Sequence, residues 1–238
     1  MLCLIALTVA GSICVFALYP FFGRREYLDT ITRVWSRLIL WTGGVRVIVE
    51  GLEHVSRDGK YVFVANHQSN FDIPLCFAVI PARLRMMAKK ELFRIPVFGW
   101  AMRIVKHIVI DRENPDKAIK SIDLAVERLQ HEDIAPVVYP EGTRSIDGKV
   151  GQFKKGAFVL AIKSGRPVVP VTIVGSREIM PKKSLVIHSG TIRVCIGKPV
   201  STDSMKIEDR GELAQAVRSV IENTLHEKMK EFYDRGSR

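Results

Sequence analysis

The sequence predicts an α/β fold in which helices flank a mixed, largely parallel β-sheet, preceded by an N-terminal two-helix membrane motif. Two observations lead to this prediction. From Val45 onward, short runs of β-branched residues alternate with helical stretches, which is the pattern of strands joined by crossover helices. Before Val45, a long uncharged apolar segment is followed by an amphipathic one.

The apolar segment runs from Leu2 to Phe22 and contains no charged side chain. A helix of this length spans roughly 31 Å, close to the thickness of the bilayer core. Arg24 and Arg25 follow it directly, whereas a signal peptide carries its basic residues before the apolar run. We therefore expect a retained membrane anchor whose C-terminal end faces the cytoplasm. The alternative is a buried helix that packs on the rest of the protein.

The segment Tyr27–Trp41 has apolar residues at helical spacing, with arginines away from that stripe. Tryptophan on one side and arginine on the other suit a helix at a membrane interface, and an ordinary amphipathic helix against the core is the alternative. Gly43-Gly44 ends the segment. We therefore expect residues 1–43 to form a membrane anchor with an interfacial helix, and residues 44–238 to form the main α/β domain.

Seven strands and four further helices are expected in this second part. The strand candidates are short runs, most of them β-branched, at Val45–Val49, Tyr61–Ala65, Leu84–Ala88, His107–Ile110, Ala135–Tyr139, Val168–Val174 and Thr191–Ile196. The helical stretches are Pro96–Val105, Pro115–Gln130, Phe153–Lys163 and Glu208–Tyr233. Sites in such sheets gather where strands end, and two polar motifs, Asn66–Asp72 and Pro140–Arg144, directly follow apolar strands.

The amino-acid composition limits which classes of molecule the protein is expected to bind. The 238 residues are 47% apolar and carry a formal net charge of +11, which favours anionic lipid headgroups or phosphorylated substrates. Because there is no basic-aromatic recognition motif, we expect no nucleic-acid partner. The four cysteines form no Cys-x-x-Cys pair and have no His at metal-ligand spacing. We therefore expect reduced packing thiols and no metal site.

His67 and Asp72 are five residues apart, directly after an aliphatic strand. If a turn or a helix start follows the strand, the carboxylate can reach back to the imidazole. It would then fix the ring tautomer and stabilise the protonated form. The alternative is a capping aspartate beside a surface histidine.

The segment Pro140–Ser145 suits phosphate binding. Arg144 offers a planar fork for bidentate contact with a phosphate, and Gly142 permits close approach of the backbone. Thr143 adds a hydroxyl. Glu141 is suited to holding the arginine, to positioning a substrate hydroxyl, or to facing water. An ordinary polar turn is the alternative.

The segment Lys89–Trp100 mixes cations with aromatic and aliphatic side chains. That mixture suits a surface that meets a phosphate and an acyl chain together. The alternative is a loop packed by its aromatic residues, with solvated lysines.

Taken in this order, the motifs resemble those of the glycerophosphate/1-acylglycerol-3-phosphate acyltransferase family over about Val45 to Gly197. The family's Asn-His-x-Ser-x-x-Asp and Pro-Glu-Gly-Thr-Arg-Ser motifs are both matched in full. The family's second motif is similar to the stretch from Lys90 to Arg112, and its fourth to Val169-Pro170-Val171. Tyr139 stands where Phe is usual, and Lys106 where Gly is common.

The resemblance implies transfer of a fatty acyl chain from a thioester to the sn-2 hydroxyl of 1-acylglycerol 3-phosphate (lysophosphatidic acid), giving phosphatidic acid. His67 would be the general base and Asp72 its orienting partner. The resemblance assigns the acceptor's glycerol phosphate to four residues in one loop and gives phosphate or acyl contacts to two more. The loop residues are Glu141, Gly142, Thr143 and Arg144, and the other two are Lys90 and Arg112.

The resemblance also implies acyl-CoA or acyl-carrier protein as the donor substrate and no cofactor, since a thioester is already activated. Ser69 and Cys76 are candidate covalent nucleophiles, but direct attack by the bound hydroxyl suffices. We expect the catalytic domain on the cytoplasmic face of a membrane with anionic lipid. Three alternatives remain: an acyltransferase for another lysolipid, such as lyso-ornithine lipid; a hydrolase; and a non-catalytic membrane protein that binds anionic lipid.

Overall fold

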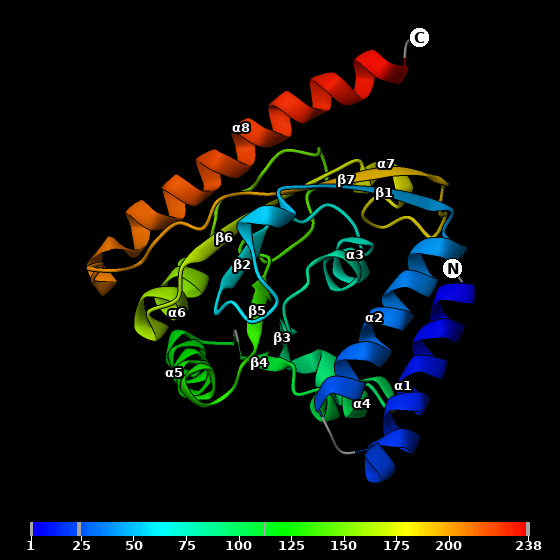
Figure 1. Ribbon diagram of the computed structural model, residues 1–238, viewed down its shortest axis with the longest axis horizontal. Helices are drawn as coiled ribbons and strands as arrows, with labels where there is room; N and C mark the ends of the chain where they lie inside the picture. The colour runs from blue at the N-terminus through cyan, green and yellow to red at the C-terminus, as the bar shows by residue number, and fades with distance from the viewer. Residues whose placement is uncertain (1, 23–24, 112, 237–238) are drawn as a thin grey trace.

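A seven-stranded sheet lies at the centre of the computed structural model, which describes residues 2–22, 25–111 and 113–236 (Figure 1). The strand order is β1-β7-β6-β2-β5-β3-β4, and every strand pair is parallel except β6 with β7. The predicted mixed, largely parallel sheet is thereby confirmed. The strands are β1 (Val45–Glu50), β2 (Val62–Ala65), β3 (Leu84–Lys89), β4 (Ile108–Ile110), β5 (Ala135–Val138), β6 (Val168–Val174) and β7 (Gly190–Ile196).

Helices cover both faces of the sheet. They are α1 (Leu2–Phe22), α2 (Arg25–Thr42), α3 (Asp72–Val79), α4 (Phe98–Ile104), α5 (Pro115–His131), α6 (Gly156–Ser164), α7 (Ser176–Ile179) and α8 (Arg210–Gly236), with short 3-10 helices at Leu52–His54, Lys90–Arg94 and Ile207–Asp209. Figure 1 shows α1 to α4 on one side, and α5, α6 and α8 on the other. All six helices expected from the sequence form, and α3 and α7 are additional.

The central strands are buried on both faces, which explains their unbroken apolar runs. In β2, Phe63 and Ala65 join the core beneath α2 and α3, whereas Val62 and Val64 join the core beneath α6 and α8. All four side chains are fully buried. The two cores fix the position of the strands. The polar motifs begin at the carboxyl ends of these strands.

The N-terminal helix packs on the protein. α1 contacts α2 and α4, and its Val15 is buried in a small cluster with Leu28, Ala101 and Val105. Among the residues that the structure describes, no helix is both long and apolar enough to cross a membrane. The spanning anchor expected over Leu2–Phe22 is therefore not supported. Apolar side chains nevertheless remain exposed along α1: Ile5, Val9, Ile13, Phe16, Leu18 and Tyr19.

The helix α2 is also tied to the sheet domain. Arg33 donates from its guanidinium to the carbonyls of Ile80 (3.1 Å) and Pro81 (3.3 Å), directly after α3. Arg85 of β3 forms a buried ion pair with Asp29 at 2.6 Å. These contacts give α2 a packed inner side, while Val34, Leu38 and Trp41 stay exposed.

Candidate active site

The two polar motifs lie side by side because their strands are neighbours. β2 pairs with β5 in parallel, with Val64 opposite Val138. His67 and Glu141 each follow three residues after that pair, so they emerge together at the carboxyl edge. Asn66 secures the end of β2, because its side-chain amide donates to the Ile173 carbonyl (2.9 Å) and accepts from the Ile173 amide (2.8 Å).

His67 and Asp72 are in direct contact, which is one of the two alternatives that their spacing left open. The Nδ1 of His67 lies 2.8 Å from the Oδ2 of Asp72, the first residue of α3. The same oxygen accepts from the backbone amides of Gln68 (2.7 Å) and Ser69 (2.8 Å). Asp72 is fully buried and fixed in this way. Because a carboxylate oxygen accepts, the Nδ1 of His67 is the donor in this contact, and the Nε2 lies on the other side of the ring.

Glu141 braces the backbone beside His67. One carboxylate oxygen accepts from the His67 amide (2.8 Å) and the other from the Gly151 amide (2.9 Å). The Ser145 amide in turn donates to the His67 carbonyl at 2.7 Å. Burial raises the pKa of the Glu141 carboxyl, although these backbone hydrogen bonds oppose the change. The predicted phosphate loop is thus bound to both backbone groups of His67, a role for Glu141 that sequence reasoning missed.

Thr143 and Arg144 line an open pocket next to the Glu141 carboxylate, together with Lys149 and Lys182. Gly142 has a φ of +73°, in the left-handed region that glycine adopts without strain. Lys182 comes from the segment after α7, and its ammonium donates to the Thr143 hydroxyl at 2.9 Å. Sequence reasoning missed Lys182, because a single lysine in a polar loop gives no signal of its own.

Lys90 is brought to the same edge of the sheet but is already paired. Its ammonium contacts Asp111 at 3.0 Å and also Glu113. These two partners neutralise its charge, so the structure does not present Lys90 as a free phosphate ligand. Arg112, the other predicted contact in this motif, lies outside the described residues.

Neither candidate covalent nucleophile is accessible. The Ser69 side chain is fully buried, and its hydroxyl donates to the Met180 carbonyl (2.9 Å) while accepting from the Phe71 amide (3.2 Å). Cys76 is also fully buried, and burial raises the pKa of its thiol to about 12. Ser69 and Cys76 therefore have structural roles, and His67 is the candidate reactive side chain of its motif.

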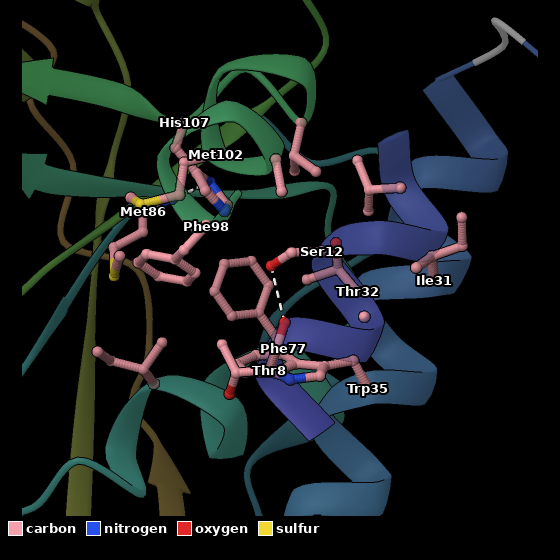
Figure 2. A pocket seen from close by; sticks show the side chains of 15 residues that line it. Thr8, Ser12, Ile31, Thr32, Trp35, Phe77, Met86, Phe98, Met102 and His107 are labelled. Carbon is pink, nitrogen blue, oxygen red and sulfur yellow. Dashed lines mark hydrogen bonds between the residues drawn. The ribbon is translucent and has the colours of Figure 1, made fainter. Parts of the chain in front are cut away.

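An apolar cavity of about 70 Å³ lies between the N-terminal helices and the sheet domain (Figure 2). Trp35, Phe77 and Phe98 are among its lining residues, and Ile73 and Phe77 belong to the helix that begins with Asp72. The hydroxyls at its wall bond within their own helices; the Ser12 hydroxyl, for example, donates to the Thr8 carbonyl at 2.7 Å. The indole nitrogen of Trp35, in contrast, is buried without a hydrogen-bond partner among the described residues. The cavity is suited to an apolar chain and begins within two turns of the histidine-aspartate pair.

Comparison with known proteins agrees with this geometry. The family model described as Acyltransferase matches residues 46–174, a range that holds both polar motifs. The chain is 33% identical over 219 residues to the chloroplastic 1-acyl-sn-glycerol-3-phosphate acyltransferase of Arabidopsis thaliana, covering 90% of this chain and 60% of that relative. It is 32% identical over 231 residues to the 1-acyl-sn-glycerol-3-phosphate acyltransferase of Saccharomyces cerevisiae, covering 94% and 76%.

The fold also matches a solved structure. The 1-acyl-sn-glycerophosphate (LPA) acyltransferase from Thermotoga maritima superposes with a TM-score of 0.75 at 29% identity, covering 94% of this chain and 95% of that one. The chain spans about 60% of the length of the chloroplastic relatives that it matches. A family match over more than half of the sequence, relatives above 30% identity and a formed histidine-aspartate pair lead to one conclusion: the chain belongs to the acyltransferase family.

Proposed function

We propose that the protein transfers a fatty acyl chain from a thioester to the sn-2 hydroxyl of 1-acylglycerol 3-phosphate, giving phosphatidic acid. The observation that carries this proposal is the 2.8 Å contact between His67 and a buried Asp72. The names of the relatives supply the substrate class. The donor is acyl-CoA or acyl-carrier protein, and the reaction needs no cofactor because a thioester is already activated.

In the proposed reaction, the Nε2 of His67 takes the proton from the acceptor hydroxyl as its oxygen attacks the thioester carbonyl. The tetrahedral intermediate then collapses, which forms the new ester and breaks the carbon-sulfur bond. His67 returns the proton to the departing thiolate. Asp72 keeps the ring in the required tautomer and stabilises the imidazolium between these two steps.

The acceptor phosphate binds in the open pocket beside Glu141. Arg144 supplies the bidentate fork, Lys182 a second cation and Thr143 a hydroxyl, and all three line the pocket. Gly142 lets the backbone approach the glycerol phosphate. The first carbons of an acyl chain would enter the cavity of Figure 2, whose lining includes Ile73 and Phe77 of α3.

Binding to a membrane surface completes the proposal, because substrate and product are both lipids. The exposed apolar side chains of α1 and of α2 lie on neighbouring helices, next to the exposed Trp100 of α4. They would enter one leaflet of the bilayer, while the net charge of +11 attracts anionic headgroups. The catalytic domain would face the cytoplasm, where both candidate donors occur.

One assay tests the reaction and its alternatives. Purified protein is incubated with labelled acyl-CoA or acyl-carrier protein and with a panel of lysolipid acceptors. We expect labelled phosphatidic acid, formed only with 1-acylglycerol 3-phosphate. A product only with another lysolipid, such as lyso-ornithine lipid, would change the assigned acceptor. Free fatty acid without an acceptor would indicate a hydrolase, and no turnover with either donor would contradict the proposal.

A further inference from the structure

Tyr139 lies directly behind the histidine-aspartate pair. It follows β5, it is buried, and its ring stacks on the His67 imidazole with centroids 4.2 Å apart and planes 25° apart. One face of the reactive ring is therefore covered by a side chain from a different strand.

The Tyr139 hydroxyl makes its own contacts with the other member of the pair. It donates to the Asp72 carbonyl at 2.8 Å and lies 3.5 Å from the sulfur of Cys76. Burial, with the nearby Cys76 and Asp72, raises the pKa of Tyr139 well above its ordinary value, so the phenol stays a donor at working pH. The hydroxyl thus ties the first residue of α3 to the end of β5.

We propose that Tyr139 is a positioning residue for the acyl transfer, holding the His67 ring by stacking and the Asp72 backbone by its hydroxyl. His67 is delivered by β2 and Asp72 by α3, so their alignment depends on two separate elements. Tyr139 reaches both from a third element. The proposal rests on the proposed function, in which His67 must alternate between neutral and protonated forms without moving away from the reacting atoms.

The two contacts have separate expected effects. Tyr139→Phe keeps the stack and loses the hydrogen bond, so we expect kcat to fall about 3- to 10-fold with KM for donor and acceptor within about twofold. Tyr139→Leu also loses the ring, and we expect kcat to fall about 10- to 100-fold. The ring face favours an adjacent imidazolium. Its loss should therefore move the acidic limb of the pH-rate profile to lower pH in the Leu variant only.

Tyr61→Phe is a matched control, because it removes a hydroxyl near the opposite end of β2, where the ring packs on Phe63. Unchanged kcat in both Tyr139 variants, at the same folded fraction, would overturn the positioning role while leaving the proposed function intact. An active His67→Ala variant would instead overturn the proposed function. If Tyr139→Leu does not fold, the Tyr139→Phe variant alone tests the proposal. A lower kcat with an unchanged melting temperature would support the positioning role, and a wild-type kcat would refute it.

Discussion

The carboxylate of Asp72 is held by three donors, namely the His67 ring and two backbone amides of the turn that joins them. Replacing His67 by Ala removes the base, for which we expect a loss of about 10² to 10⁴ in kcat. Asp72→Asn keeps the size but removes the charge that stabilises the imidazolium, so it should also reduce turnover strongly. Thermal unfolding would check that both variants fold. Near wild-type turnover by a folded His67→Ala protein would exclude this mechanism.

A second prediction concerns the acceptor phosphate. A charge-assisted hydrogen bond contributes roughly 1.5–3 kcal/mol, so Arg144→Ala should raise the acceptor KM about 10- to 150-fold. Arg144→Lys should rescue only part of this loss, because an ammonium cannot reproduce the fork. Lys182→Ala should act in the same direction, more weakly. Steady-state kinetics with 1-acylglycerol 3-phosphate would measure these effects, and an equal loss with a 1-acylglycerol lacking phosphate would argue against phosphate contact.

The contacts that could be predicted from the sequence are those between residues close together along the chain. His67 and Asp72 are close in sequence, so their spacing limits their geometry. The brace from Glu141 to the His67 amide joins residues 74 apart and depends on the register of two strands, which spacing cannot supply. The Lys182 contact with Thr143 is of the same kind, joining loops after different strands.

At the scale of elements, the helix α3 shows where pattern reading fails. Its sequence is apolar almost throughout, with Pro74 in the first turn, and six of its eight residues are buried. A helix buried on all sides has no polar face, so it lacks the period that identifies amphipathic helices such as α5. All seven strands were predicted from the sequence. Six of them carry Val or Ile, whereas β3 (Leu84–Lys89) is mostly apolar without any β-branched residue.

The packing of β4 against β3 yields a prediction about pH. His107 precedes β4, and its Nδ1 accepts from the Met86 amide at 3.2 Å, which requires a neutral ring. Burial lowers the pKa of His107 to about 3. The pKa of His107 is lower in the folded protein than in the unfolded chain. The stabilisation that the neutral His107 ring contributes is therefore complete above about pH 6.5 and is lost as the pH falls toward 3.

We therefore expect the free energy of unfolding to fall below pH 6.5 with a slope of at most about 1.4 kcal/mol per unit from this one group. In His107→Asn, the amide oxygen can accept from Met86 without titrating, and that part of the slope should disappear. Denaturant unfolding at several pH values between 4 and 8 would measure it. An unchanged slope in the variant would show that His107 does not titrate as its burial implies.

At the scale of the whole molecule, the three parts of the proposed site are neighbours. The open pocket follows β5, the His67–Asp72 pair follows β2, and the apolar cavity lies beside α3 toward the N-terminal helices. Thr8 and Gly11 of α1 and Trp35 of α2 line that cavity, so it lies behind the two helices that carry the exposed apolar side chains. This arrangement would let a lipid acceptor keep its chain near the bilayer while its phosphate reaches the cationic pocket.

The last prediction tests that arrangement. Ile5, Ile13 and Phe16 of α1 are 53%, 52% and 59% exposed. Burying a half-exposed apolar side chain contributes about 1 kcal/mol, so replacing all three by Ser should weaken vesicle binding roughly 100-fold. Because apolar burial is not screened by ions, this part of the binding should persist in high salt, whereas attraction to anionic lipid should decline.

Co-sedimentation with vesicles of neutral or anionic lipid, at low and high salt, would separate the two contributions. The matched control replaces Ile119 and Leu124 of α5 by Ser, since these side chains are similarly exposed on the opposite side of the sheet (Figure 1). We expect this control to bind like the wild type. The α1 variant should keep its turnover on detergent-dispersed substrate, because His67, Asp72 and Arg144 are untouched. Wild-type vesicle binding by the α1 variant would rule out α1 as the membrane-facing surface.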